Sequence, residues 1–152
     1  MNNGPARKCI HCGGNTVRPR KRPGRTTRYR TMPAMLVPSH IEIPTCGRCW
    51  SEFIDGEVAA SIEPELAAAY LSELQSRVRT ALDKICPHYI SQRQLELRIG
   101  LSQGYLSRLR ARHGNPSPAL VAQLAQLACD PFWRLVELEQ FWAEPNTTRS
   151  PL

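Results

Sequence analysis

The sequence lacks the features that mark membrane-spanning, secreted and enzymatic proteins. None of its apolar runs approaches the roughly 20 residues that a transmembrane helix needs. Residues 1–14 have no apolar core of the kind found in a signal peptide, so we expect a cytoplasmic protein. The chain shows no nucleophile–base arrangement, no glycine loop for phosphate and no carboxylate cluster. We therefore expect no enzymatic activity.

What the chain has instead is positive charge. Its 152 residues carry a net charge of +7, which favours a polyanionic partner, either a nucleic acid or a membrane surface. Residues 1–62 hold ten Lys or Arg against four Asp or Glu, and residues 91–113 hold five against one. The absence of a membrane-spanning run leaves nucleic acid as the favoured partner. The length allows one medium domain or two small ones.

Four of the six cysteines form two CxxC pairs, Cys9 with Cys12 and Cys46 with Cys49. Each pair makes a tight turn that directs two thiolates to one point, and two such turns give the tetrahedral sulfur site that structural zinc prefers. A disulfide pair, a redox motif and an iron–sulfur cluster are the alternatives. We expect one structural Zn²⁺ without a catalytic role, because four thiolates leave no ligand position for water.

The region between the CxxC pairs is basic. Residues 18–30 hold seven Lys or Arg, and they are predicted to form a loop followed by a strand at about 26–32. Short strands at 34–37 and 40–43 would complete a small antiparallel sheet clamped by zinc. The basic loop either contacts phosphates or an acidic partner, or it is a solvated loop, and both interpretations remain open.

The stretch 91–112, SQRQLELRIGLSQGYLSRLRAR, has the pattern of two short helices joined by a tight turn. Ser91 is a plausible N-cap, and Gln94 completes a capping box with it. Gly100 can take the left-handed conformation that ends a helix. Ser102 is predicted to cap the second helix. An ordinary helical hairpin would show much of the same pattern.

The second helix of this stretch can be oriented from its spacing. At 100° per residue, Ser102, Leu106 and Leu109 share one side, and we expect the leucines to face the protein. The opposite side carries small residues and arginine, which suits insertion into the major groove, where Arg and Gln contact base edges. The predicted DNA-binding residues are Gln92, Arg93, Ser102, Gln103, Gly104, Ser107, Arg108 and Arg112.

Four short motifs stand in this part of the chain: SQ at 91–92, IGLSQ at 99–103, YLSRL at 105–109 and PSP at 116–118. They resemble the phage-repressor-like Cro/C1 (XRE) family of helix-turn-helix domains. The resemblance implies that Gln103, Gly104 and Arg108 read bases. It also implies that Gln92 holds a phosphate and braces the reading glutamine. Glu96 departs from the family pattern, which has a small residue there, so we expect either a wider helix crossing or an ion pair with a nearby arginine.

Three more helices accompany this motif. Pro64 suits the first position of a long helix, which Pro87 ends. Ser117 and Asp130, each followed by proline, begin two further helices. The predicted fold class is α+β, with a zinc-bound β module at 1–58, an all-α five-helix helix-turn-helix domain at 64–144 and a tail at 145–152.

The last of these helices, from Asp130 onward, is apolar almost all round, which is more than one core face requires. Its apolar side chains either pair with a second copy of the chain or are buried within one copy. We expect a homodimer through this helix and the long helix, because a dimer would present two recognition helices to a palindromic DNA site. The unpaired Cys86 and Cys129 are expected to be buried free thiols.

The order of parts, CxxC pairs followed by this helix-turn-helix, resembles the MqsA/YgiT-type zinc-finger antitoxins along nearly the entire chain. The resemblance implies a dimer that represses its own operon and a zinc module that binds a small toxin protein. The predicted function is a sequence-specific repressor of double-stranded DNA, the antitoxin of a type II toxin–antitoxin pair. The alternatives are an RNA-binding or protein-adaptor zinc module and a repressor without a toxin partner.

Overall fold

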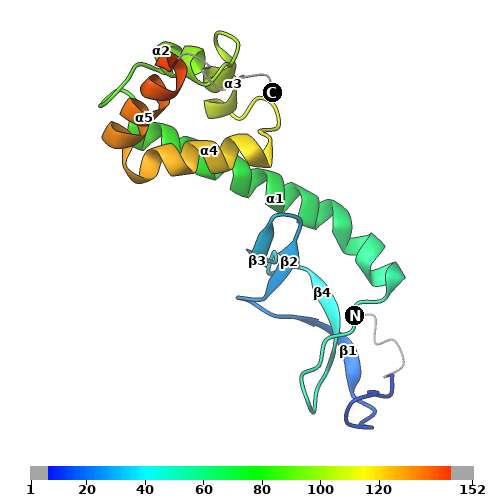
Figure 1. Cartoon of the computed structure of the whole chain (residues 1–152). Helices are drawn as coiled ribbons and strands as arrows, with labels where there is room; N and C mark the ends of the chain where they lie inside the picture. Colours follow the sequence, from blue (N-terminus) through cyan, green and yellow to red (C-terminus); the bar gives the residue numbers. More distant parts are fainter. Residues whose placement is uncertain (1–6, 145–152) are drawn as a thin grey trace, which may run out of the picture. The chain divides into compact units, whose positions relative to one another are not determined.

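The computed structural model describes residues 7–144, which divide into two compact units after Tyr70. The elements are β1 (Val17–Lys21), β2 (Thr26–Tyr29), β3 (Met32–Leu36), β4 (Glu42–Cys46), α1 (Gly56–Ile85), α2 (Gln92–Arg98), α3 (Tyr105–Arg110), α4 (Pro118–Cys129) and α5 (Pro131–Ala143) (Figure 1). This order confirms the predicted fold class of a small β module followed by five helices. The predicted tail at 145–152 lies outside the described residues.

The β module contains two antiparallel pairs, β1–β4 and β2–β3, rather than the single sheet that was predicted. The strand expected at 26–32 is interrupted by a turn at Arg30, whose φ is 49°, so the chain reverses into the β2–β3 hairpin. Residues 17–21, expected in a loop, form β1 despite Pro19. This proline lies opposite Pro44 in the register. In a non-hydrogen-bonded pair of this kind, neither strand needs the missing N–H group.

Helix α1 begins at Gly56, so the predicted start at Pro64 is wrong. Asp55 caps the helix, because its carboxylate accepts a hydrogen bond from the Val58 N–H at 2.9 Å and its carbonyl accepts one from the Ala59 N–H at 2.8 Å. Aspartate is a strong N-cap residue. Pro64 consequently lies inside the helix, where it removes one backbone donor.

The N-terminal part of α1, residues 56–70, covers the β module within the first unit. Leu66 and Tyr70 are buried there. The Tyr29 hydroxyl donates to the Glu63 carboxylate at 2.5 Å, and the hydroxyls of Thr31 and Tyr70 are 2.7 Å apart. The extra length of α1 therefore packs on the strands of the module.

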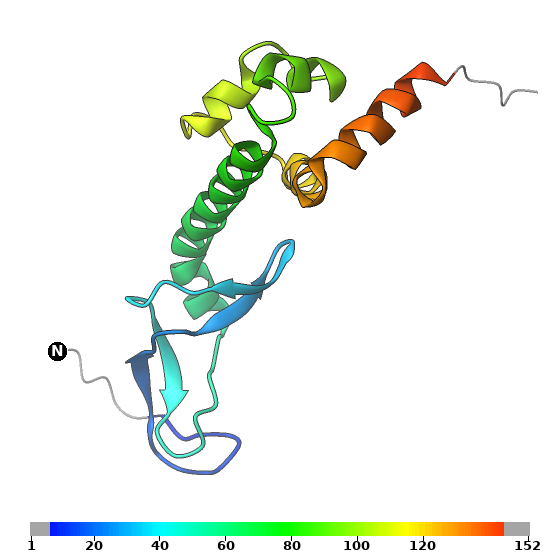
Figure 2. The same ribbon diagram turned by 90° about the vertical axis from the view of Figure 1, so that its left-hand side faces the viewer.

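The second unit has its own core. One stripe of the C-terminal part of α1 supplies three of its fully buried side chains, and α2, α3 and α4 supply the others. These side chains are Val78, Leu82, Ile85, Leu95, Leu106 and Leu124. Figures 1 and 2 show α2 and α3 beside one another at the C-terminal end of α1. The predicted cap of α4 is present, since the Ser117 hydroxyl accepts from the Leu120 N–H at 3.2 Å.

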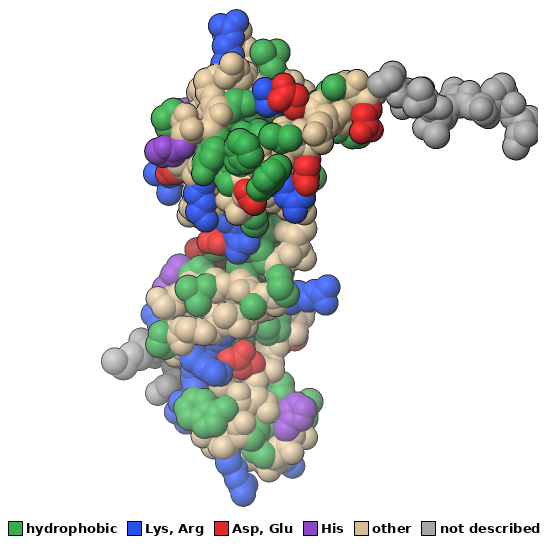
Figure 3. Space-filling view, turned by 60° about the vertical axis from the view of Figure 1, so that its left-hand side comes forward, with side chains coloured by type: hydrophobic (Ala, Val, Ile, Leu, Met, Phe, Trp, Pro, Cys, Tyr) green, Lys and Arg blue, Asp and Glu red, His purple; other side chains and the backbone are tan. Residues whose placement is uncertain are grey.

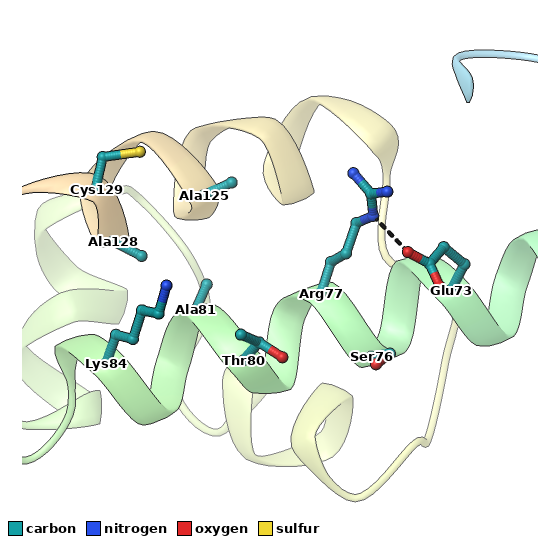
Figure 4. Close-up of a pocket in the computed structure, with 9 residues that line it drawn as sticks. All are labelled: Glu73, Ser76, Arg77, Thr80, Ala81, Lys84, Ala125, Ala128 and Cys129. Carbon is teal, nitrogen blue, oxygen red and sulfur yellow. Dashed lines mark hydrogen bonds and ion pairs between the residues drawn. The ribbon is translucent and has the colours of Figure 1, made fainter. Parts of the chain in front are cut away.

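A groove of about 290 Å³ lies between α1 and α4 of the second unit. Small side chains from both helices face it, as Figure 4 shows. The Arg77–Glu73 ion pair, 2.8 Å long, lies at one end. Cys129 lines the other end and is exposed, so the prediction of a buried free thiol is wrong for Cys129 and confirmed for Cys86.

Candidate functional site

The four cysteines of the CxxC pairs converge on one point in the first unit. Their Sγ atoms all lie within 4.8 Å of one another. Cys9 and Cys49 are 3.5 Å apart, and Cys12 and Cys46 are 3.6 Å apart. A tetrahedral site with Zn–S bonds of about 2.3 Å has sulfur–sulfur separations of about 3.8 Å. The donor set and its size are therefore compatible with a structural metal site.

The surroundings of these sulfurs favour thiolates at some positions and oppose them at others. A hydrogen bond from the Thr16 hydroxyl, helped by backbone N–H groups, lowers the pKa of Cys46 to about 5. The hydrogen bond from the Gly14 N–H lowers the pKa of Cys12. Burial and the hydrogen bonds of the neighbouring thiols outweigh it and raise the pKa of Cys12 to about 11. Four thiolates this close repel one another, and a divalent cation offsets that repulsion.

The two CxxC turns share one backbone geometry. The Gly13 N–H donates to the Cys9 carbonyl at 2.9 Å, and the Trp50 N–H donates to the Cys46 carbonyl at 3.1 Å. The two donors are left-handed, with φ of 70° for Gly13 and 62° for Trp50. Glycine adopts this conformation without a steric penalty, whereas a tryptophan does not.

In the second unit, α2 begins and ends as predicted. Ser91 is the N-cap, and both hydrogen bonds of the capping box with Gln94 are present. Gly100 takes the left-handed conformation with φ of 75°. The chain reversal is closed by the Leu101 N–H, which donates to the Glu96 carbonyl at 2.8 Å.

Helix α3 begins at Tyr105, so the prediction that Ser102 caps it is wrong. Gly104, with φ of 77°, holds the N-cap position and has no side chain to act as the cap. The cap is provided by Glu96 of α2, whose carboxylate accepts from the Gly104 N–H at 2.9 Å and from the Leu106 N–H at 2.8 Å. A negative charge at a helix N-terminus is also favoured by the helix dipole.

Glu96 therefore binds backbone N–H groups and forms no ion pair within residues 7–144, so the alternative of an ion pair with an arginine is wrong. Its side chain is buried, with 3% of the residue exposed. The sequence contained a signal for this role, since Glu96 stands three residues before Ile99 and next to Leu95, at the edge of the inward stripe of α2. Sequence reasoning identified the unusual residue but not its partner.

The C-terminal end of α3 is tied to α1 within the second unit. The Arg110 guanidinium pairs with the Asp83 carboxylate, and the Arg110 carbonyl accepts from the Arg79 guanidinium at 3.1 Å. Gln75 of α1 also donates to the carbonyl of Gly114, just after α3, at 3.2 Å. Glu96 at one end and α1 at the other thus fix the direction of this short helix.

Six of the eight predicted DNA-binding residues are exposed; these are Arg93, Ser102, Gln103, Ser107, Arg108 and Arg112. Gln92 is half-buried, and its amide donates to the Ser107 hydroxyl at 2.6 Å, so it braces Ser107. Gly104 is half-buried in the turn before α3. Leu106 and Leu109 are buried, as predicted for the inward side.

Arg112 does not lie on α3, which ends at Arg110. Its φ is 61°, and the His113 N–H donates to the Arg108 carbonyl at 2.8 Å to close the turn. The Arg108 guanidinium lies 5.9 Å from the centre of the Tyr105 ring. The exposed face therefore combines the turn before α3, the helix itself and the turn after it.

Residues 84–127 match the family model described as helix-turn-helix. This segment is a helix-turn-helix domain. The match supports a sequence-specific DNA-binding transcription regulator, and proteins of this family are regulators rather than enzymes. The comparisons with curated proteins and with solved structures yield no significant match. Within residues 7–144, no helix combines the length and the apolar character that crossing a membrane requires.

We expect the four cysteines to bind a structural metal, and its removal should unfold the first unit and leave the second folded. Zinc binding contributes about 10–16 kcal/mol in small zinc modules, far more than a core of this size provides. We expect a chelator, or Cys46→Ser, to collapse the amide NMR dispersion of residues 7–70 while the signals of residues 71–144 persist. Cys86→Ser, at a buried cysteine outside the cluster, should retain the metal. Unchanged signals for residues 7–70 after metal removal would contradict the assignment.

Proposed function

We propose that the protein is a transcriptional repressor that binds a specific double-stranded DNA operator. The observation that carries this proposal is the exposed face formed by α3 and its preceding turn. Gln103, Ser107 and Arg108 lie on it, while Leu106 and Leu109 anchor the opposite side. A short helix with a buried apolar side and an exposed hydrogen-bonding side suits the major groove.

The arginines of the helix-turn-helix support this orientation. Arg98 and Arg110 form ion pairs with carboxylates of α5 and α1. Arg93, Arg108 and Arg112 form no ion pair within residues 7–144, and all three are exposed. The unpaired arginines are the ones predicted from the sequence to contact DNA. Exposed cations without ion pairs are available for contact with phosphates and base edges.

The contacts can be divided by the chemistry of each side chain. Arg108 can form paired hydrogen bonds to the O6 and N7 atoms of guanine, and Gln103 can do the same with adenine. Ser107, braced by Gln92, offers a hydroxyl to a base edge or a phosphate. We assign Arg93 and Arg112 to phosphates.

We further propose that the repressor is a homodimer, with α5 in the interface. Leu135 is the one residue of α5 that is buried within the described chain. Four aromatic side chains of the same helix are exposed to 56–66%: Phe132, Trp133, Phe141 and Trp142. Large exposed apolar patches mark association surfaces. A two-fold dimer presents two copies of α3 to two half-sites of an operator.

We also propose that the chain is the antitoxin of a type II toxin–antitoxin pair and regulates its own operon in the cytoplasm. The resemblance in the order of parts supports this, and so does the division into two compact units, because a partner protein could occupy the first unit while the second holds DNA. The test is co-purification of the full chain with the product of the adjacent reading frame. If no adjacent small protein binds, the chain is a repressor without a toxin partner.

Arg108→Ala should weaken operator binding by about 1–3 kcal/mol and relax specificity at one base position. Fluorescence anisotropy with operator duplexes substituted at single positions measures both effects. Arg98→Ala, which removes an arginine paired with α5, is the matched control and should leave specificity unchanged. If Arg108→Ala weakened binding to every duplex by the same factor, this residue would contact only the DNA backbone.

Combined Phe132→Ser and Trp133→Ser substitutions should convert the dimer to a monomer, because they remove exposed apolar surface without touching Leu135. Sedimentation velocity at micromolar concentration measures the change. Glu137→Ala, on the same helix and exposed, should leave the dimer intact. A monomeric wild-type chain under these conditions would refute the proposed interface.

A further inference from the structure

The first unit contains a cationic cavity that operator binding by α3 does not use. It has a volume of about 330 Å³, which is at the small end of the range of about 300–1,000 Å³ for ligand pockets. Its lining residues are Arg20, Lys21, Arg22, Arg25, Thr45 and Trp50. Figure 3 shows Lys and Arg side chains next to hydrophobic ones on the β-containing part of the molecule.

Cations outnumber carboxylates around this cavity. Its ion pairs are Lys21–Glu42 at 4.0 Å, Arg22–Glu52 at 3.4 Å and Arg25–Glu52 at 2.8 Å. Four cationic side chains thus have two carboxylates between them, and Arg20 has no ion pair within residues 7–144. The excess positive charge in a concave site favours an anionic ligand.

Arg20 is held beside the cavity with an unused hydrogen-bond donor. Its Nε atom is buried and donates no hydrogen bond within the described residues. The guanidinium carbon lies 5.7 Å from the centre of the Trp50 ring. A Cβ atom at Gly47 would lie 2.7 Å from the Arg20 Nη2 atom, so this glycine leaves the space that the guanidinium occupies. A buried donor without an acceptor is costly, and an anionic oxygen would satisfy it.

Trp50 stands where the first CxxC turn has Gly13. Both residues adopt the left-handed conformation, which is strained for a bulky side chain. The Trp50 residue is 58% exposed, so core packing does not account for a tryptophan here. A strained, exposed aromatic residue next to a cation cluster indicates a binding role.

We propose that the cationic cavity binds a nucleotide unit, with the phosphate at Arg20 and the base stacked on Trp50. Guanidinium groups form paired hydrogen bonds with phosphate oxygens, and bases stack on aromatic side chains with little sequence preference. Bases in a duplex are already stacked on each other, so the unit comes from a single-stranded nucleic acid or from a free mononucleotide. The site is independent of operator binding, which uses α3.

The test uses the full zinc-loaded chain and a short fluorescein-labelled single-stranded RNA, followed by fluorescence anisotropy. We expect Trp50→Gly and Arg20→Ala each to weaken binding at least about fivefold, as stacked bases require. Trp50→Phe should retain most of the binding, because phenylalanine keeps an aromatic face. Arg28→Ala is the matched control, since Arg28 is an exposed arginine of β2 outside the cavity. It should have a smaller effect.

Trp50→Gly should keep the metal content and the melting temperature, because glycine adopts the left-handed conformation freely. A loss of RNA binding by a folded Trp50→Gly variant would therefore report the missing aromatic face. Arg108→Ala should leave RNA binding unchanged. Dependence on Arg108 would instead place the RNA on α3 and overturn the proposal.

Competitors separate the two sources of the nucleotide unit. Competition by 5′-GMP at concentrations comparable to those of the RNA would assign a free mononucleotide, and competition only by longer strands would assign a single-stranded nucleic acid. Inorganic phosphate or duplex DNA competing as well as the RNA would overturn the proposal, because neither presents a base to Trp50. Equal weakening by Trp50→Gly and Arg28→Ala would also overturn it.

Discussion

The orientation of the surface that we propose reads DNA depends on one buried carboxylate. Glu96 of α2 accepts hydrogen bonds from the N–H groups of Gly104 and Leu106, and these bonds define where α3 starts. A helix of this length does not form stably in isolation, so its position must come from contacts with the rest of the unit. Arg110 provides the corresponding contact at the other end through Asp83 of α1. The exposed residues of α3 point outward because both ends are held.

The sequence was most informative where one residue determines local geometry. The capping box of Ser91 and Gln94 and the left-handed Gly100 were predicted because each acts within a few residues of itself. The convergence of the CxxC pairs was predictable because the spacing of each pair already directs two sulfurs to one point. The inward leucines of α3 followed from helical periodicity.

The predictions failed where a distant partner decided the outcome. Ser102 looked like a cap, but the N–H groups of α3 bind a carboxylate eight and ten residues before them in the chain. Pro64 looked like a helix start, but the earlier cap at Asp55 and the packing of α1 on the β module outweigh the lost backbone bond. Pro19 could enter a strand because its pair with Pro44 is non-hydrogen-bonded, so the missing N–H group is not needed by the partner strand. None of these pairings is visible in a local pattern.

Amide hydrogen exchange measured by NMR is the most direct test of whether Glu96 holds the N-terminus of α3. We expect the amides of Gly104 and Leu106 to exchange slowly, like core amides of the second unit, and we expect Glu96→Ala to raise their exchange rates to those of exposed amides. If both amides exchange quickly in the wild-type protein, or remain protected in Glu96→Ala, the carboxylate does not position α3.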